Sequence, residues 1–192
     1  MSAVADQGHA VDRRRTVWLA APLLPPWPVV WLAAGDRAGR SGPEHAGRAW
    51  ALALDDGTSE PRIETFAADP EGTDDRGAWE RFVVRAGELL DRHPHARWVH
   101  GSRPTRTRLL ADAARHGAPA GFLQRIEEAL FDLLARGVGP SLGLPPGADS
   151  IRAVAGRLGL SPISMDAPTG ELLEMRAVWR WLLREGPRTH CG

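Results

Sequence analysis

The chain has 192 residues, 43% of them hydrophobic, and its 24 basic and 24 acidic residues give a formal net charge of zero. This length suits one domain, and the hydrophobic content excludes a chain that is disordered throughout. Because the net charge is zero, only a local patch could attract nucleic acid. Lysine, asparagine and tyrosine are absent, a bias typical of a GC-rich bacterial genome that makes arginine the default surface cation.

The single cysteine, Cys191, cannot form a disulfide, a zinc ligand set or a redox pair within the chain, which fits a reducing cytoplasm. The uncharged stretch 16–35 follows three arginines and so resembles a signal or membrane segment. It is interrupted by Pro22, Pro25, Pro26 and Pro28, which would break the helix that a bilayer requires. We therefore expect a cytoplasmic protein with no membrane partner, in which this stretch leads into a buried strand.

The pattern of residues predicts one domain at 16–186, between a flexible tail at 1–15 and a C-terminal tail at 187–192. The continuous apolar run 29–34 suits a central strand that is covered on both faces. Further strands are predicted at 48–54 and 62–66, on either side of a turn signal at 55–57. Together these three strands predict an antiparallel meander.

After the meander, apolar residues recur at helical spacing. Helices are predicted at 79–90, from a Thr105 cap to Gly117, at 120–129, from an Asp149 cap to 158, and at 172–183. A short strand is predicted at 96–100, while 130–133 fits either a helix or a strand. This order predicts an α/β fold with a central mixed five-stranded sheet, the meander plus parallel strands, flanked by helices.

Several short motifs lie in a characteristic order at 23–26, 32–36, 98–101, 115–117, 131–133 and 149–152. Their order and spacing resemble those of the RNase H-like exonuclease domain of the YprB-type group, which is associated with RecB-like nucleases. The resemblance covers roughly residues 23 to 185. It implies an RNase H-like sheet and a role in DNA repair or another nucleic-acid process.

The acidic motifs of that family are largely missing here. Its first strand ends in Asp-x-Glu-Gly-Asp, and this chain has Leu32 and Ala34 at the two carboxylate positions that come first. A third acidic position falls on or near Thr105, so that only Asp132 remains in register. The family resembles two-metal nucleases, whose Mg²⁺ or Mn²⁺ ions lie about 4 Å apart and need several carboxylates. The resemblance therefore implies a domain that has lost catalysis by this route.

Other acids could take over the missing role. Asp36, Glu64 and Asp149 join Asp132 as candidate metal ligands, and Asp132 and Asp36 are the candidate catalytic residues. Each also has an ordinary interpretation: a loop residue for Asp36, a solvent-facing strand position for Glu64, an N-cap for Asp149, and a cap or ion pair for Asp132. An active protein would be a Mg²⁺- or Mn²⁺-dependent, 3′–5′ exonuclease-like nuclease. Without such activity we expect no cofactor.

The best local patch of positive charge surrounds the fourth strand and the helix after it, and consists of Arg97, Arg103, Arg106, Arg108 and Arg115. Within it Arg103 and Arg106 are candidates for phosphate contacts, which position a strand without reading its sequence. With them, Arg152 and His100 complete the candidate nucleic-acid-binding residues. Tryptophans at 50 and 98 could stack on bases, although tryptophans in strands more often belong to the core.

The sequence leaves three functions open. The first is a degenerate nuclease fold retained to bind single-stranded DNA, RNA, or a nuclease or helicase subunit. The second is an active metal-dependent nuclease that uses the relocated carboxylates. The third is a module that binds only proteins. A Walker-type phosphate loop is excluded, because the chain has no lysine.

Overall fold

The computed structural model describes residues 19, 22, 24–39, 42–68, 75–101, 103–143, 150–160 and 168–186, without the side chains of 36–39, 42–47 and 103. The predicted tails and Asp149 lie outside these residues. The strands are β1 (Val29–Gly39), β2 (Gly42–Asp55), β3 (Glu64–Ala67), β4 (Arg97–His100) and β5 (Leu130–Asp132). The helices are α1 (Arg76–Arg92), α2 (Arg103–His116), α3 (Phe122–Ala129), the π-helix η2 (Leu133–Val138), α4 (Ile151–Arg157) and α5 (Thr169–Glu185).

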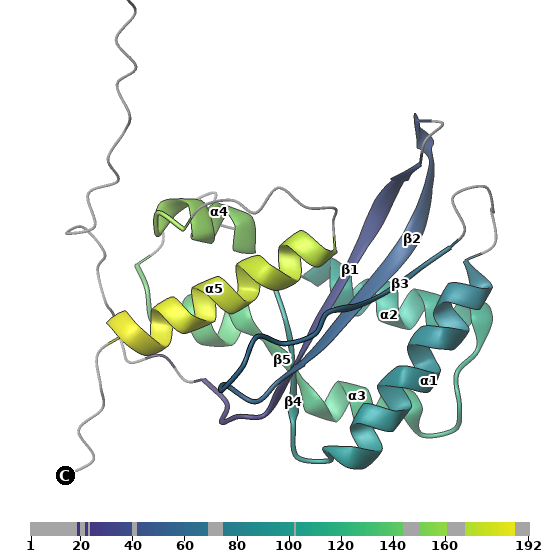
Figure 1. Ribbon diagram of the computed structural model, residues 1–192, viewed down its shortest axis with the longest axis horizontal. Coiled ribbons are helices and arrows are strands. Elements are labelled where there is room, and N and C mark those ends of the chain that lie inside the picture. Colours follow the sequence, from purple (N-terminus) through teal and green to yellow (C-terminus); the bar gives the residue numbers. More distant parts are fainter. Residues whose placement is uncertain are drawn as a thin grey trace, which may run out of the picture.

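The five strands form one sheet in the order β3-β2-β1-β4-β5 (Figure 1). β2 is antiparallel to both of its neighbours, β1 and β3, whereas β4 and β5 run parallel to β1. The predicted mixed five-stranded sheet is therefore confirmed. Segment 130–133, which fitted either a helix or a strand, contains both: β5 ends at Asp132, and η2 begins at the next residue.

Side chains of β1 alternate between two hydrophobic cores. Val29, Trp31 and Ala33 belong to the core beneath α4 and α5. Val30, Leu32 and Ala34 belong to the core beneath α1, α2 and α3. Helices thus cover both faces of the sheet (Figure 1), which is why the apolar run in β1 shows no polar alternation.

Strands β1 and β2 are longer than predicted. Their antiparallel register continues from Val29 opposite Asp55 as far as Gly39 opposite Gly42. The extension consists of small and polar residues, and backbone hydrogen bonds maintain it without a hydrophobic pattern that could have revealed it. Asp36, which was expected to be a loop residue, consequently lies within β1.

Two predicted helix caps are wrong. α2 begins at Arg103, so Thr105 lies inside the helix, where it is fully buried. α4 is capped by Ser150, whose Oγ accepts a hydrogen bond of 3.2 Å from the backbone N–H of Ala153. Of the helices in the described ranges, none has the length and apolar character needed to cross a bilayer.

Candidate functional site at the carboxyl end of the parallel strands

A single row of residues crosses the sheet at the level of Leu32, one of the two aliphatic residues that the sequence comparison singled out on β1. In strand order from β3 to β5 it consists of Glu64, Leu52, Leu32, His100 and Asp132. Leu32 lies level with His100 because the parallel register pairs Trp31 with Val99 one residue earlier. The row thus contains three predicted site residues, with Leu32 at its centre.

The centre of the row is apolar and packed. Leu32 is fully buried, and Ala34 is 7% exposed. Both belong to the core that also contains Trp50 and Phe82, whose rings stack with centroids 4.6 Å apart. Aliphatic side chains offer no oxygen to a hard cation, so β1 cannot supply a ligand at these two positions.

Glu64 and Asp132 lie at opposite edges of the sheet. Four strand spacings separate β3 from β5, which amounts to about 19 Å at roughly 4.8 Å per spacing. Metal ions in a two-metal site lie about 4 Å apart, so these two carboxylates cannot belong to one such site. The row therefore does not bring the predicted metal ligands together.

The carboxylate of Glu64 is held by an arginine. The sequence had predicted a solvent-facing position instead. Arg85 on α1 donates from Nη2 to Glu64 Oε1 at 2.7 Å and from Nε to Oε2 at 3.0 Å. A hydrogen bond to Glu64, and to a lesser extent one to Glu88, raises the pKa of Arg85 above its usual value. This bidentate pair anchors α1 to β3.

Asp132 acts as a helix cap. Its Oδ1 accepts a hydrogen bond of 2.8 Å from the backbone N–H of Ala135, at the start of η2. One of the two ordinary interpretations of this residue, that of a cap, is therefore confirmed. The cap occupies an oxygen that a metal ion would otherwise use.

His100 is placed beside Asp132 but is only 3% exposed. It ends a central strand that helices cover on both faces (Figure 1). A contact between His100 and nucleic acid stays a prediction, to which its burial gives no support. Among the described residues, no three His, Cys, Asp or Glu side chains could together hold a metal ion, so these residues do not fit a two-metal centre.

The remaining predicted residues are only partly described. Asp36 pairs with Arg48 in the register of β1 and β2, but its side chain and that of Arg103 lie outside the described part, as does all of Asp149. Arg152 is exposed and donates from Nε to Glu174 Oε1 at 3.0 Å. Glu174 itself is buried on α5.

Sequence reasoning missed a buried polar contact beneath α2. The carboxylate of Asp112 accepts a hydrogen bond of 3.1 Å from Trp50 Nε1 and forms an ion pair with Arg48. The signal was present in the helical pattern, because Asp112 lies three residues after Leu109 and so falls on the apolar face of α2. Trp50, a candidate for base stacking, is accordingly a core residue.

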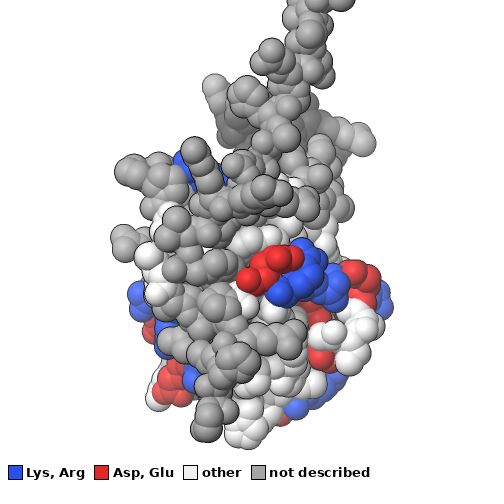
Figure 2. Space-filling model, turned by 90° about the vertical axis from the view of Figure 1, so that its left-hand side faces the viewer, with Lys and Arg blue, Asp and Glu red and all other residues white. Residues whose placement is uncertain are grey.

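The predicted basic patch is largely matched by acceptors. Arg106 pairs with Glu127 at 2.7 Å, and Arg115 lies 3.9 Å from Asp75. Arg97 donates to the backbone carbonyl of Glu128 at 2.7 Å. Figure 2 shows a similar arrangement on one face of the molecule, where described basic and acidic side chains lie side by side. Arg106 and Arg115 thus have acidic partners, which weakens the case for phosphate binding, whereas Arg97 donates to a neutral carbonyl.

No family model, curated protein or solved structure matches this chain. The functional conclusion therefore depends on the geometry of the row and of the patch. The centre of the row is apolar, and its two carboxylates, Glu64 and Asp132, lie at opposite edges of the sheet and accept hydrogen bonds from other protein groups. In the patch, Arg106 and Arg115 have acidic partners.

Proposed function

We propose that this chain is a catalytically inactive RNase H-like domain that works as a protein-binding module. The burial of Leu32 and Ala34 is the observation that carries this proposal. The sheet order, an antiparallel meander followed by two parallel strands, supports the resemblance to the RNase H-like group. A nuclease or helicase subunit is the class of partner that fits such a domain.

A nuclease assay tests the loss of catalysis. The full chain would be incubated with Mn²⁺ and with labelled single-stranded DNA or RNA, and an Asp132→Ala variant would be treated in parallel. We expect no cleavage above that of the variant, because the central positions of the row provide no metal ligand. Metal-dependent cleavage that the Asp132→Ala substitution abolishes would overturn the proposal and establish an active nuclease with relocated carboxylates.

Nucleic-acid binding is the second candidate function, and the sequence patch is the reason to consider it. Because a phosphate would have to displace the acidic partners of Arg106 and Arg115, we expect a dissociation constant weaker than about 10⁻⁴ M for a fluorescent single strand even at low salt. Binding by phosphate neutralisation would instead give an affinity that falls linearly with salt on logarithmic axes. If such a salt dependence were observed, and if Arg106→Gln reduced the affinity, nucleic acid and not a protein would be the partner of this domain.

A further inference from the structure

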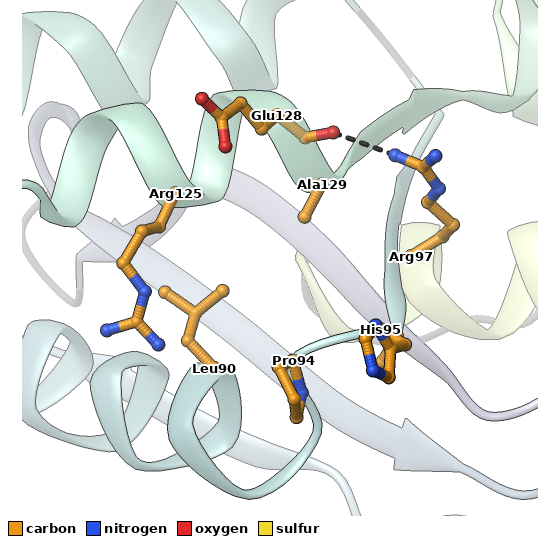
Figure 3. Close-up of a pocket in the computed structure, with 8 residues that line it drawn as sticks. Leu90, Pro94, His95, Arg97, Arg125, Glu128 and Ala129 are labelled. Atoms are coloured by element: carbon orange, nitrogen blue, oxygen red, sulfur yellow. Dashed lines mark hydrogen bonds between the residues drawn. The ribbon is translucent and has the colours of Figure 1, made fainter.

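A pocket of about 270 Å³ opens at the start of β4, where α1 and α3 both end. Its floor is apolar and consists of Leu90, Pro94, Ala96 and Ala129. Figure 3 shows Arg125 on one side of Leu90 and Ala129, with Arg97 on the other side and His95 below it. The pocket therefore combines an apolar floor with two guanidinium groups at its rim.

Arg97 is positioned by a contact that leaves its charge uncompensated. Its Nη1 donates to the backbone carbonyl of Glu128 at 2.7 Å, which satisfies an acceptor in the last turn of α3. Within the described ranges its guanidinium meets no carboxylate. Since a neutral carbonyl uses only one of the five N–H donors of arginine, the others can bind an anion.

Arg125 on the other side has an acidic partner that a ligand can displace. Its Nη2 lies 2.8 Å from Asp91 Oδ1, and the two side chains are 47% and 70% exposed. Ion pairs at such exposed positions contribute little stability, about 0.2–1 kcal/mol. A ligand carboxylate that is partly removed from water by the pocket would therefore compete with Asp91.

The composition of the rim selects the charge of the ligand. Asp91 pairs with Arg125, and in Figure 3 the carboxylate of Glu128 lies on the far side from Arg97. Among the described groups of the rim, Arg97 therefore carries the positive charge that no carboxylate pairs, which suits a singly charged anion better than a phosphate dianion. The apolar floor suits a short aliphatic body next to that anion. We propose that this pocket binds a carboxylate attached to a short aliphatic group, either in a free small molecule or at the C-terminus of a peptide.

This site is separate from the row described above. The pocket lies at Arg97, where β4 begins, whereas His100 and Asp132 lie at the carboxyl ends of β4 and β5. The inference does not depend on whether the domain is RNase H-like or inactive, since it uses only the pocket and its rim.

Titration of the full chain with N-acetyl-leucine, monitored by NMR or calorimetry, tests the proposal. A pocket of this size should give a dissociation constant of about 1 mM, because few ligand atoms can be buried. N-acetyl-leucinamide, which lacks the charge, should bind at least about tenfold more weakly, since charge-assisted hydrogen bonds are lost. A peptide ending in leucine that binds more tightly than N-acetyl-leucine would identify the chain terminus as the source, and the reverse order would identify the free molecule.

Variants locate the binding. Arg97→Gln and Arg125→Gln should each weaken binding about tenfold, whereas Arg157→Gln, at an exposed position on α4, should leave it unchanged. Asp91→Asn removes the competing carboxylate and should tighten binding about two- to fivefold. Ala129→Leu fills the cavity without changing any charge and should abolish binding.

Three results would overturn the proposal. These are no binding to the wild-type chain up to about ten times the expected dissociation constant, equal binding of the acid and the amide, and equal binding by wild type and Ala129→Leu. Circular dichroism of every variant establishes that it is folded, and the opposite direction of the Asp91→Asn effect cannot be produced by a general loss of structure.

Discussion

Arg48 on β2, whose side chain is 35% exposed, forms an ion pair with the buried Asp112 on α2 and so ties the sheet to the helix above it. The same carboxylate accepts a hydrogen bond from Trp50, and the backbone N–H of Arg48 donates to Asp75 Oδ1 at 3.3 Å, next to the start of α1. β2, α1 and α2 thus meet at this pair. Its role is structural, since the carboxylate is buried against Arg48 and Trp50.

Asp112→Ala should therefore destabilise the fold strongly. The substitution leaves the buried indole N–H of Trp50 without its acceptor, which costs about 1–3 kcal/mol, and it also removes the partner of Arg48. Urea unfolding would measure the loss of unfolding free energy. The control is Glu80→Ala, which breaks an exposed pair with Arg76 and should cost less than about 1 kcal/mol. Equal effects of the two substitutions would contradict a stabilising role for the contacts of Asp112.

Much of the sheet could be predicted from the sequence because its signals are local. The apolar run that predicts β1 and the turn signal that follows β2 each occupy only a few consecutive residues. The helical spacing of apolar residues likewise predicted α1 and α5 from within each segment. Contacts between distant residues carry no such signal. Trp50 and Asp112 are separated by 62 positions, so the helical pattern that places Asp112 on the apolar face of α2 did not indicate which residue it contacts.

The candidate site was harder to predict for the same reason. Asp132, Glu64 and His100 are plausible ligands by residue type, but their use depends on which neighbours the fold brings to them. Arg85 reaches Glu64 from α1, and the π-helix after β5 places Ala135 over Asp132. The distance between Glu64 and Asp132 follows from the order and register of the strands. The register between strands that are distant in the sequence cannot be predicted from either segment alone.

Gly101→Ala should loosen the contact between β4 and the helices on the α4–α5 side. A Cβ at this position would lie 2.5 Å from Ile151 Cγ1 and 2.9 Å from Met175 Cγ, both of which belong to buried side chains. Such overpacking costs about 1–3 kcal/mol, measurable as a lower melting temperature. Gly87→Ala is the matched control in α1, where nothing lies within 4 Å of the new Cβ. It should raise stability by about 0.5–1 kcal/mol through helix propensity, and a loss of stability there would contradict this explanation.

Acid should weaken the link between α5 and the loop that follows β2. A hydrogen bond from Arg176 holds the pKa of Glu60 below its usual value of 4.5. A carboxylate whose pKa is lowered by folding contributes stability that is present above its unfolded pKa and is lost as the pH falls through the folded value. Glu60→Gln should therefore make the decline of unfolding free energy below about pH 4.5 shallower.

Urea unfolding at a series of pH values would measure this decline. Glu80→Gln removes the same chemical group at an exposed position on α1, and so corrects for the general effect of one carboxylate fewer. An equally shallow decline in both variants would show that the contact between Glu60 and Arg176 has no specific effect.

A carboxylate introduced at Leu32 or Ala34, where the proposed resemblance to the RNase H-like group would place acids, should harm this domain rather than create a metal site. Leu32→Asp places a carboxylate in a fully buried position, where an unpaired charge costs several kcal/mol, whereas Leu32→Ala costs about 2–5 kcal/mol for the cavity alone. Ala34→Asp makes the same test at the rim of the core, where the substitution adds side-chain volume and leaves no cavity. Melting temperatures would be measured with and without Mn²⁺. If Leu32 and Ala34 lie in a packed core, Mn²⁺ will not raise the melting temperature of either acidic variant above its effect on wild type. An increase that grows with Mn²⁺ concentration, as binding to the folded state requires, would instead show that oxygen ligands surround these positions and that the domain retains the frame of a metal centre.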